Sequence, residues 1–213
     1  MTRLWIPGWQ MTRHCFDAVK QTLNASQEAT LTYEENDVGL DQWLHKVSMT
    51  ITEPTEVVGW SLGGALAYLL ASENKLITKV WLINTNVQFS GEQGLPVNVA
   101  ESFMSRYQCN SSATKKRFTM LVDSQRAKDI SAYLLQGDHQ ASLQSLYTFN
   151  ASDHQVDAIC HILLSQQDQL VPFSKAKHAW QLNEPTTISA INAQHSAPIF
   201  KPEQIAQWIH HNG

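Results

Sequence analysis

The stretch at residues 56–71 constrains the fold of this chain more than any other. Residues 56–58 (Glu-Val-Val) are typical of a buried strand, and residues 62–71 form an apolar segment of helical length. Between them lie Gly59, Trp60, Ser61, Leu62 and Gly63. A strand that turns so abruptly into a helix needs small residues at the turn, because the two backbones approach closely. The stretch therefore predicts a strand, a tight turn and a helix, with Ser61 projecting from the turn.

Short apolar runs elsewhere alternate with segments of helical periodicity. Continuous apolar strands separated by helices are typical of a parallel sheet that is covered on both faces. We therefore expect an α/β fold with a mostly parallel sheet of about six strands and helices on both sides. The expected strands are residues 4–6, 30–33, 56–58, 80–83, 158–164 and 187–191, and the clearest other helices are residues 39–51 and 203–211.

Residues 86–155 break this alternation. They contain no convincing buried strand, and helical patterns begin near Pro96 and cover residues 113–122 and 127–135. The segment is too long for a crossover helix and its loops. We expect it to form a helical cap over the carboxyl edge of the sheet, where open α/β sheets bind ligands. The whole chain, residues 1–213, would then be one domain with this insertion.

Composition excludes several classes of protein. The chain has 213 residues, of which 43% are hydrophobic and 16% charged, and its net charge of -4 argues against a nucleic-acid binder. No apolar run approaches the roughly 20 residues of a membrane-spanning helix, and no signal-peptide core follows the first residues. Three cysteines, odd in number and without metal-ligand spacing, suit a reducing compartment. We expect a cytoplasmic monomer without a bound metal or cofactor.

A serine nucleophile needs a base and an acid that orients the base. In strand–turn–helix hydrolases the chain order is serine, then acid, then histidine. Asp168 follows the expected strand at residues 158–164, and His195 follows the strand at residues 187–191. Both would lie at the carboxyl edge, on the same side as Ser61. We therefore predict Ser61, Asp168 and His195 as the catalytic residues.

Two backbone N–H groups are expected to bind the oxyanion that forms when the serine attacks. The first belongs to Leu62, directly after the nucleophile. The second belongs to the loop after the first strand, where Trp9 follows Pro7 and Gly8. The indole of Trp9 would also form a wall of the acyl pocket, although a plain core position is the simpler alternative.

Taken together, these segments resemble the α/β-hydrolase superfamily. A narrower resemblance, to the pimeloyl-(acyl-carrier protein) methyl ester esterases of biotin synthesis, rests on Gly8-Trp9, on the turn around Ser61, on Asp168-Gln169-Leu170-Val171-Pro172 and on His195-Ser196-Ala197-Pro198. The resemblance implies hydrolysis of a methyl ester on a pimeloyl chain that acyl-carrier protein holds. It implies the same catalytic residues and the same two oxyanion donors. Pro7 departs from the histidine that many relatives carry there.

Charge provides a separate indication of a partner. Residues 106–128 carry six basic side chains and one acid, Asp123, a net charge of +5, so the rest of the chain carries -9. Acyl-carrier protein is strongly acidic, and complementary charge steers association. A charge run is as a rule a solvated helix face, and that reading stays open. The predicted docking residues are Arg106, Lys115, Lys116, Arg117 and Arg126.

Two other functions are compatible with these residues. A general short-chain carboxylesterase or thioesterase would use the same catalytic residues on free small molecules. A non-catalytic receptor with a hydrolase fold would have no need of Ser61, Asp168 and His195 together, which makes it the weaker alternative.

Overall fold

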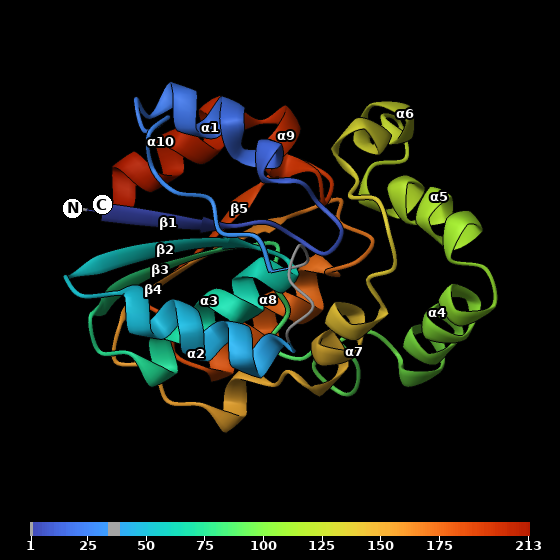
Figure 1. The fold of residues 1–213 in the computed structure, drawn as a ribbon, viewed down its shortest axis with the longest axis horizontal. Coiled ribbons are helices and arrows are strands. Elements are labelled where there is room, and N and C mark those ends of the chain that lie inside the picture. Colours follow the sequence, from blue (N-terminus) through green and yellow to red (C-terminus); the bar gives the residue numbers. More distant parts are fainter. Residues whose placement is uncertain (1, 34–38) are drawn as a thin grey trace.

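A computed structural model describes residues 2–33 and 39–213 of the chain. At its centre is a sheet of five parallel strands (Figure 1), which lie side by side in chain order. This confirms the predicted parallel α/β fold. The strands are β1 (Thr2–Ile6), β2 (Thr55–Trp60), β3 (Ile77–Ile83), β4 (Ile159–Ser165) and β5 (Thr187–Ile191).

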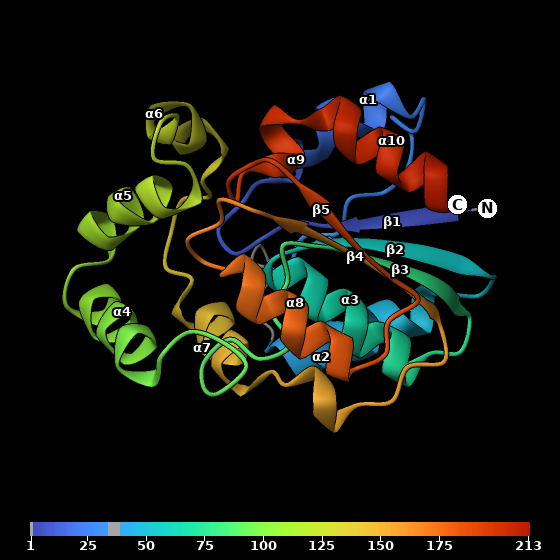
Figure 2. The same cartoon turned by 180° about the vertical axis from the view of Figure 1, so that it is seen from behind.

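Helices cover both faces of the sheet, as Figures 1 and 2 show. One face carries α1 (Asp17–Thr22), α9 (Ala197–Phe200) and α10 (Pro202–Asn212). The other face carries α2 (Leu40–Thr50), α3 (Leu62–Glu73) and α8 (Phe173–Leu182). Among the described residues, no helix is both long enough and apolar enough to cross a membrane.

The centre of the sheet explains why the sequence folds in this way. All six residues of β2 are buried, and so are nine of the twelve residues of α3, which packs on it. Burial on both faces requires continuous apolar strands, and this is the pattern that the sequence shows. The serine turn therefore joins two elements that are mostly buried.

Among the residues that the structure describes, the sheet has five strands, where about six were expected. Residues 30–33, predicted as a strand, form a single parallel bridge between Thr30 and Trp5. Two backbone hydrogen bonds hold this bridge, from Trp5 N to Ala29 O (3.0 Å) and from Leu31 N to Trp5 O (2.7 Å). One bridge does not make a ladder, so the sixth strand is reduced to one point of contact beside β1.

Four helices lie between β3 and β4 and extend beyond the carboxyl ends of the strands (Figure 1). This is the helical cap that the sequence predicts. The expected helix at residues 127–135 is shorter: after α6 the chain forms a 3-10 turn, Ser131–Tyr133, and then an antiparallel bridge from Leu134 to Met11. The cap helices are α4 (Val97–Cys109), α5 (Ser111–Val122), α6 (Ala127–Ile130) and α7 (Gln140–Thr148).

His161 makes the folded state sensitive to acid. Its imidazole is buried in β4, stacks on Trp81 with ring centroids 4.5 Å apart, and contacts Thr187 Oγ1 at 2.8 Å. Burial, and secondarily the nearby Lys79 ammonium, lower the pKa of His161, whereas Glu56 acts in the opposite direction. Because the unfolded state then binds more protons than the folded state, stability falls as the pH drops below the ordinary histidine pKa of about 6.5.

The replacement His161→Phe keeps a ring on Trp81 and removes the titrating group. We expect its free energy of unfolding, measured in urea at pH 5 and pH 7, to change less with pH than that of the unmodified protein. His45 is exposed, and His45→Phe serves as the control that keeps the original pH dependence. An unchanged pH dependence in His161→Phe would contradict the role given to burial.

Candidate active site

Ser61 occupies a strained turn between β2 and α3. Its backbone has φ 56° and ψ -119°, a left-handed conformation that a residue with a side chain rarely adopts. The flanking glycines are required by close contacts. A Cβ on Gly59 would lie 2.3 Å from Gly63 O, and one on Gly63 would lie 2.1 Å from Ile6 O. The turn thus pushes Ser61 out of the sheet at the N-terminus of α3.

Asp168 and His195 come from two different loops and meet in the structure. His195 Nδ1 lies 2.7 Å from Asp168 Oδ2, and both residues are buried. The other carboxylate oxygen, Oδ1, accepts hydrogen bonds from the N–H groups of Leu170 (2.8 Å) and Val171 (2.9 Å). These two donors fix the carboxylate, and the carboxylate in turn fixes the imidazole ring.

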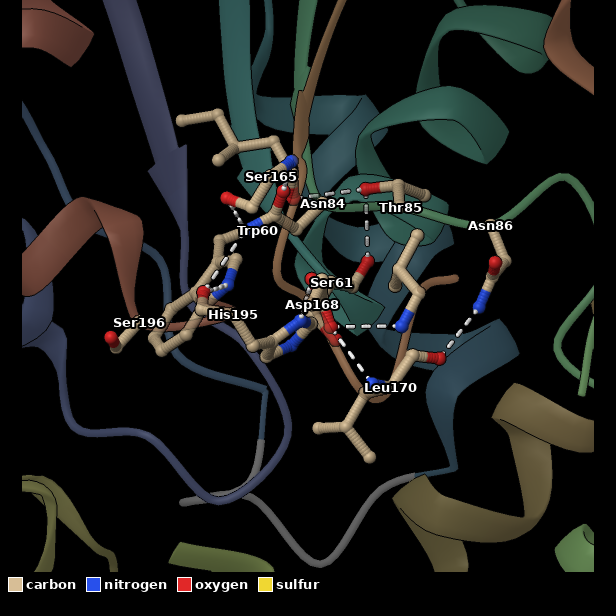
Figure 3. Close-up of polar contacts among 12 residues, drawn as sticks. Trp60, Ser61, Asn84, Thr85, Asn86, Ser165, Asp168, Leu170, His195 and Ser196 are labelled. Carbon is tan, nitrogen blue, oxygen red and sulfur yellow. Dashed lines mark hydrogen bonds and ion pairs between the residues drawn. The ribbon is translucent and has the colours of Figure 1, made fainter. Parts of the chain in front are cut away.

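The second ring nitrogen of His195, Nε2, is not engaged by Asp168. Nε2 is buried and makes no hydrogen bond to any residue that the structure describes. Figure 3 shows Ser61, Asp168 and His195 in the same region, at the carboxyl ends of the strands. The indole of Trp60, the residue before Ser61, donates to His195 O at 3.0 Å. The structure therefore joins two of the predicted catalytic residues, Asp168 and His195, and connects the His195 loop to the residue before Ser61.

Asn84 is a buried residue of this site that the sequence analysis did not predict. It follows β3 directly, has φ 48°, and its Nδ2 donates to both Ser165 Oγ and His195 O at 3.0 Å. Its Oδ1 accepts from Ser165 N at 2.8 Å, as Figure 3 shows. Asn84 thus joins the ends of β3 and β4 to the His195 loop. The available signal was a polar residue at the carboxyl end of a buried strand.

Of the two predicted oxyanion donors, Leu62 directly follows Ser61 in the chain, and Trp9 lines the same cavity as Ser61. Leu62 is the first residue of α3, so its N–H has no acceptor within the helix. Trp9 follows Gly8, where an added Cβ would lie 3.4 Å from Ser61 Cβ. The Trp9 indole donates to His139 O in the cap at 3.1 Å. Burial lowers the pKa of the His139 imidazole.

An apolar cavity opens at Ser61, between the sheet edge and the cap. The volume of this cavity is about 110 Å³. Trp9 lies in its wall, as predicted for the acyl pocket, and packs edge-on against Phe103 and Phe118 of the cap. No aspartate, glutamate, lysine, arginine or histidine lines the cavity within the described part of the chain. Its polar lining residues are Ser61, Asn84, Thr85, Asn86 and Gln169.

The five predicted docking residues divide into two groups. Arg106, Lys116 and Arg117 line one surface groove of about 570 Å³ between α4 and α5. Lys115 instead donates to Gly137 O within the cap, and the Arg126 guanidinium stacks on Phe200 at 4.4 Å. The structure therefore brings three of the five basic side chains together at one groove.

Comparison with known proteins identifies the fold. No protein-family model and no curated protein sequence matches the chain. Solved structures do, among them a hydrolase from Oleispira antarctica (TM-score 0.83, 13% identity, 99% of this chain and 90% of that one). An esterase from Exiguobacterium antarcticum is similar too (TM-score 0.82, 13% identity, 100% of this chain and 91% of that one). So is a bromoperoxidase from Bacillus anthracis (TM-score 0.78, 15% identity, 100% of this chain and 92% of that one). The chain has the α/β-hydrolase fold, a fold that by itself does not decide the reaction.

Proposed function

We propose that the protein is a serine carboxylesterase. The observation that carries this proposal is the buried contact between His195 Nδ1 and Asp168 Oδ2. His195 Nε2 has no partner among the described residues, and Ser61 occupies a strained turn. In serine hydrolases a histidine held by a carboxylate in this way activates a serine hydroxyl. The solved structures of similar fold include proteins described as an esterase and a hydrolase, which agrees with this chemistry.

The reaction follows from the positions of these groups. His195 Nε2 takes the proton of Ser61 as its oxygen attacks the ester carbonyl, while Asp168 keeps the proton of the imidazole on Nδ1. The N–H groups of Leu62 and Trp9 stabilise the negative oxygen of the tetrahedral intermediate. The alcohol leaves with the proton from His195, and an acyl-enzyme remains. A water molecule, deprotonated by His195, then hydrolyses the acyl-enzyme and restores Ser61.

We further propose that the substrate is a pimeloyl methyl ester carried by acyl-carrier protein. The uncharged cavity at Ser61 suits a methylene chain that ends in a neutral ester. The groove lined by Arg106, Lys116 and Arg117 suits an acidic partner, and its lining includes the half-exposed apolar side chain of Met120. The sequence resemblance to the methyl ester esterases of biotin synthesis supports the same substrate. In this role the enzyme would act as a cytoplasmic monomer.

A second candidate function is hydrolysis of free short-chain esters or thioesters. It is favoured by the cavity itself, which offers an uncharged acyl site whether or not a carrier is present. The two candidates share Ser61, Asp168 and His195 and differ in whether the basic groove contributes to turnover.

Charge reversal in the groove separates these two functions. We expect the variant with Arg106→Glu, Lys116→Glu and Arg117→Glu to lower kcat/KM for the carrier-bound methyl ester by at least about 100-fold, through loss of electrostatic steering and contact. Turnover of a p-nitrophenyl ester should change less than about threefold, because the groove lies outside the cavity at Ser61.

The matched control reverses three exposed lysines outside the cap, Lys46, Lys75 and Lys177, and so changes the net charge by the same amount. It should leave both reactions nearly unchanged. Equal losses on both substrates in the groove variant, or equal losses in the groove and control variants, would contradict carrier docking at this groove.

A further inference from the structure

The one acidic side chain of the basic segment, Asp123, points into the molecule instead of to solvent. It follows α5 directly and is only 6% exposed. Its Oδ2 accepts from Ser196 Oγ at 2.6 Å, and its Oδ1 accepts from Gln194 Nε2 at 3.1 Å. Oδ1 also accepts from the backbone N–H groups of Gln125 (3.0 Å) and Arg126 (3.1 Å). A buried carboxylate that accepts four hydrogen bonds is held firmly in one position.

The residues on both sides of His195 are therefore tied to the end of α5. Gln194 precedes His195 and Ser196 follows it, and each donates to Asp123. Two further contacts strengthen the connection: Ser196 N donates to Val122 O at 3.2 Å, and Gln194 Oε1 accepts from Ser124 N at 3.0 Å. The loop that carries His195 is thus attached to the end of α5 as well as to Asp168 and to the sheet.

We propose that Asp123 is a positioning residue that sets the location of the His195 imidazole through Gln194 and Ser196. The sheet holds this loop from one side, since Trp60 and Asn84 both donate to His195 O at 3.0 Å. Asp123 holds it from the cap side. An error of about 1 Å in the position of a catalytic group costs on the order of 100-fold in rate. The proposal rests on the esterase function proposed above, because its rate measurements use that reaction.

A purely structural role for Asp123 predicts different behaviour. Its bonds to the N–H groups of Gln125 and Arg126 stabilise the turn between α5 and α6, and they do not involve His195. The double variant Gln194→Ala/Ser196→Ala leaves these two bonds intact and removes the side-chain bonds from Asp123 to the loop. Asp123→Ala removes all four bonds at once.

The test measures p-nitrophenyl ester hydrolysis by Asp123→Ala, by Gln194→Ala/Ser196→Ala and by the triple variant. We expect each to lower kcat by about 10- to 100-fold with KM changed less than about threefold. Because Asp123 acts through Gln194 and Ser196, the triple variant should lose no more activity than the double variant. Tyr147→Phe, which removes a hydrogen bond to Ala100 O within the cap, should retain full activity.

Two results would overturn the proposal. The first is a folded double variant with kcat within threefold of the unmodified protein, and the second is a triple variant whose loss equals the product of the separate losses. Hydrogen exchange of residues 193–197 gives a measure that needs no activity: we expect faster exchange in both Asp123→Ala and the double variant. Unchanged exchange there contradicts the proposed role of Asp123 in holding the His195 loop. Absence of ester hydrolysis in the unmodified protein contradicts the esterase function alone.

Discussion

Replacement of Ser61 by alanine is expected to lower kcat for ester hydrolysis by about 10⁶-fold, the loss that follows removal of a serine nucleophile with an intact base and acid. In the proposed reaction the hydroxyl of Ser61 forms the bond to the acyl group. The measurement is the initial rate on a p-nitrophenyl ester, with protein concentration high enough to detect the residual rate.

The fold should survive this change. The hydrogen bonds of Ser61 to described residues run through its backbone: its N–H donates to Ile83 O (2.9 Å). Its carbonyl accepts from Gly64 N (2.9 Å), Ala65 N (3.2 Å) and Thr85 Oγ1 (3.3 Å). We therefore expect the free energy of unfolding to change by less than about 1 kcal/mol. Ser72→Ala, in the helix that follows Ser61, is the matched control and should keep full activity. Activity above a thousandth of the original in Ser61→Ala would contradict the nucleophile assignment.

Asp168→Asn is expected to lower kcat by about 10⁴-fold, although asparagine has the same size and shape as aspartate. The amide oxygen can still accept from the N–H groups of Leu170 and Val171, which face Oδ1. The amide nitrogen then faces His195 Nδ1. Two N–H donors cannot face each other, so the imidazole must carry its proton on Nε2. That tautomer cannot take the proton of Ser61.

The pH dependence of kcat/KM identifies this cause. Asp168→Asn should recover activity at high pH, where hydroxide replaces the missing base, and its melting temperature should stay close to the original because the turn at residues 168–171 keeps its hydrogen bonds. Asp153 lies outside the site, and Asp153→Asn is the control. Equal activities of Asp168→Asn and the unmodified protein would show that another group orients His195.

The sequence alone predicts the central part of the fold because strong local signals agree there. The apolar β2, the glycines at residues 59 and 63, and the long apolar α3 all favour one strand–turn–helix unit. The order of Ser61, Asp168 and His195 along the chain then places them at one edge, because parallel strands end on the same side of a sheet. Each of these conclusions uses residues that lie close together in the sequence or follow a strand directly.

The parts that sequence does not predict depend on distant residues. The helix expected at residues 127–135 ends early because Leu134 forms a bridge with Met11, more than 120 positions away. Asp123 and Ser196 are separated by 73 positions, and no local sequence pattern predicts their contact. From the sequence, Lys115 and Arg126 are likewise predicted to belong to one basic surface. In the structure Lys115 donates to Gly137 O, and the Arg126 guanidinium lies over the Phe200 ring.

The most direct test of the account is covalent labelling with a fluorophosphonate, which reacts with serine hydroxyls that a neighbouring base activates. The protein should be labelled at one site, and mass spectrometry of the digested product should place the adduct on Ser61. Ser61→Ala should take up no label, and Asp168→Asn should react far more slowly than the unmodified protein. Folded protein that takes up no label, or an adduct on a serine other than Ser61, would contradict the assignment of Ser61 as the activated nucleophile.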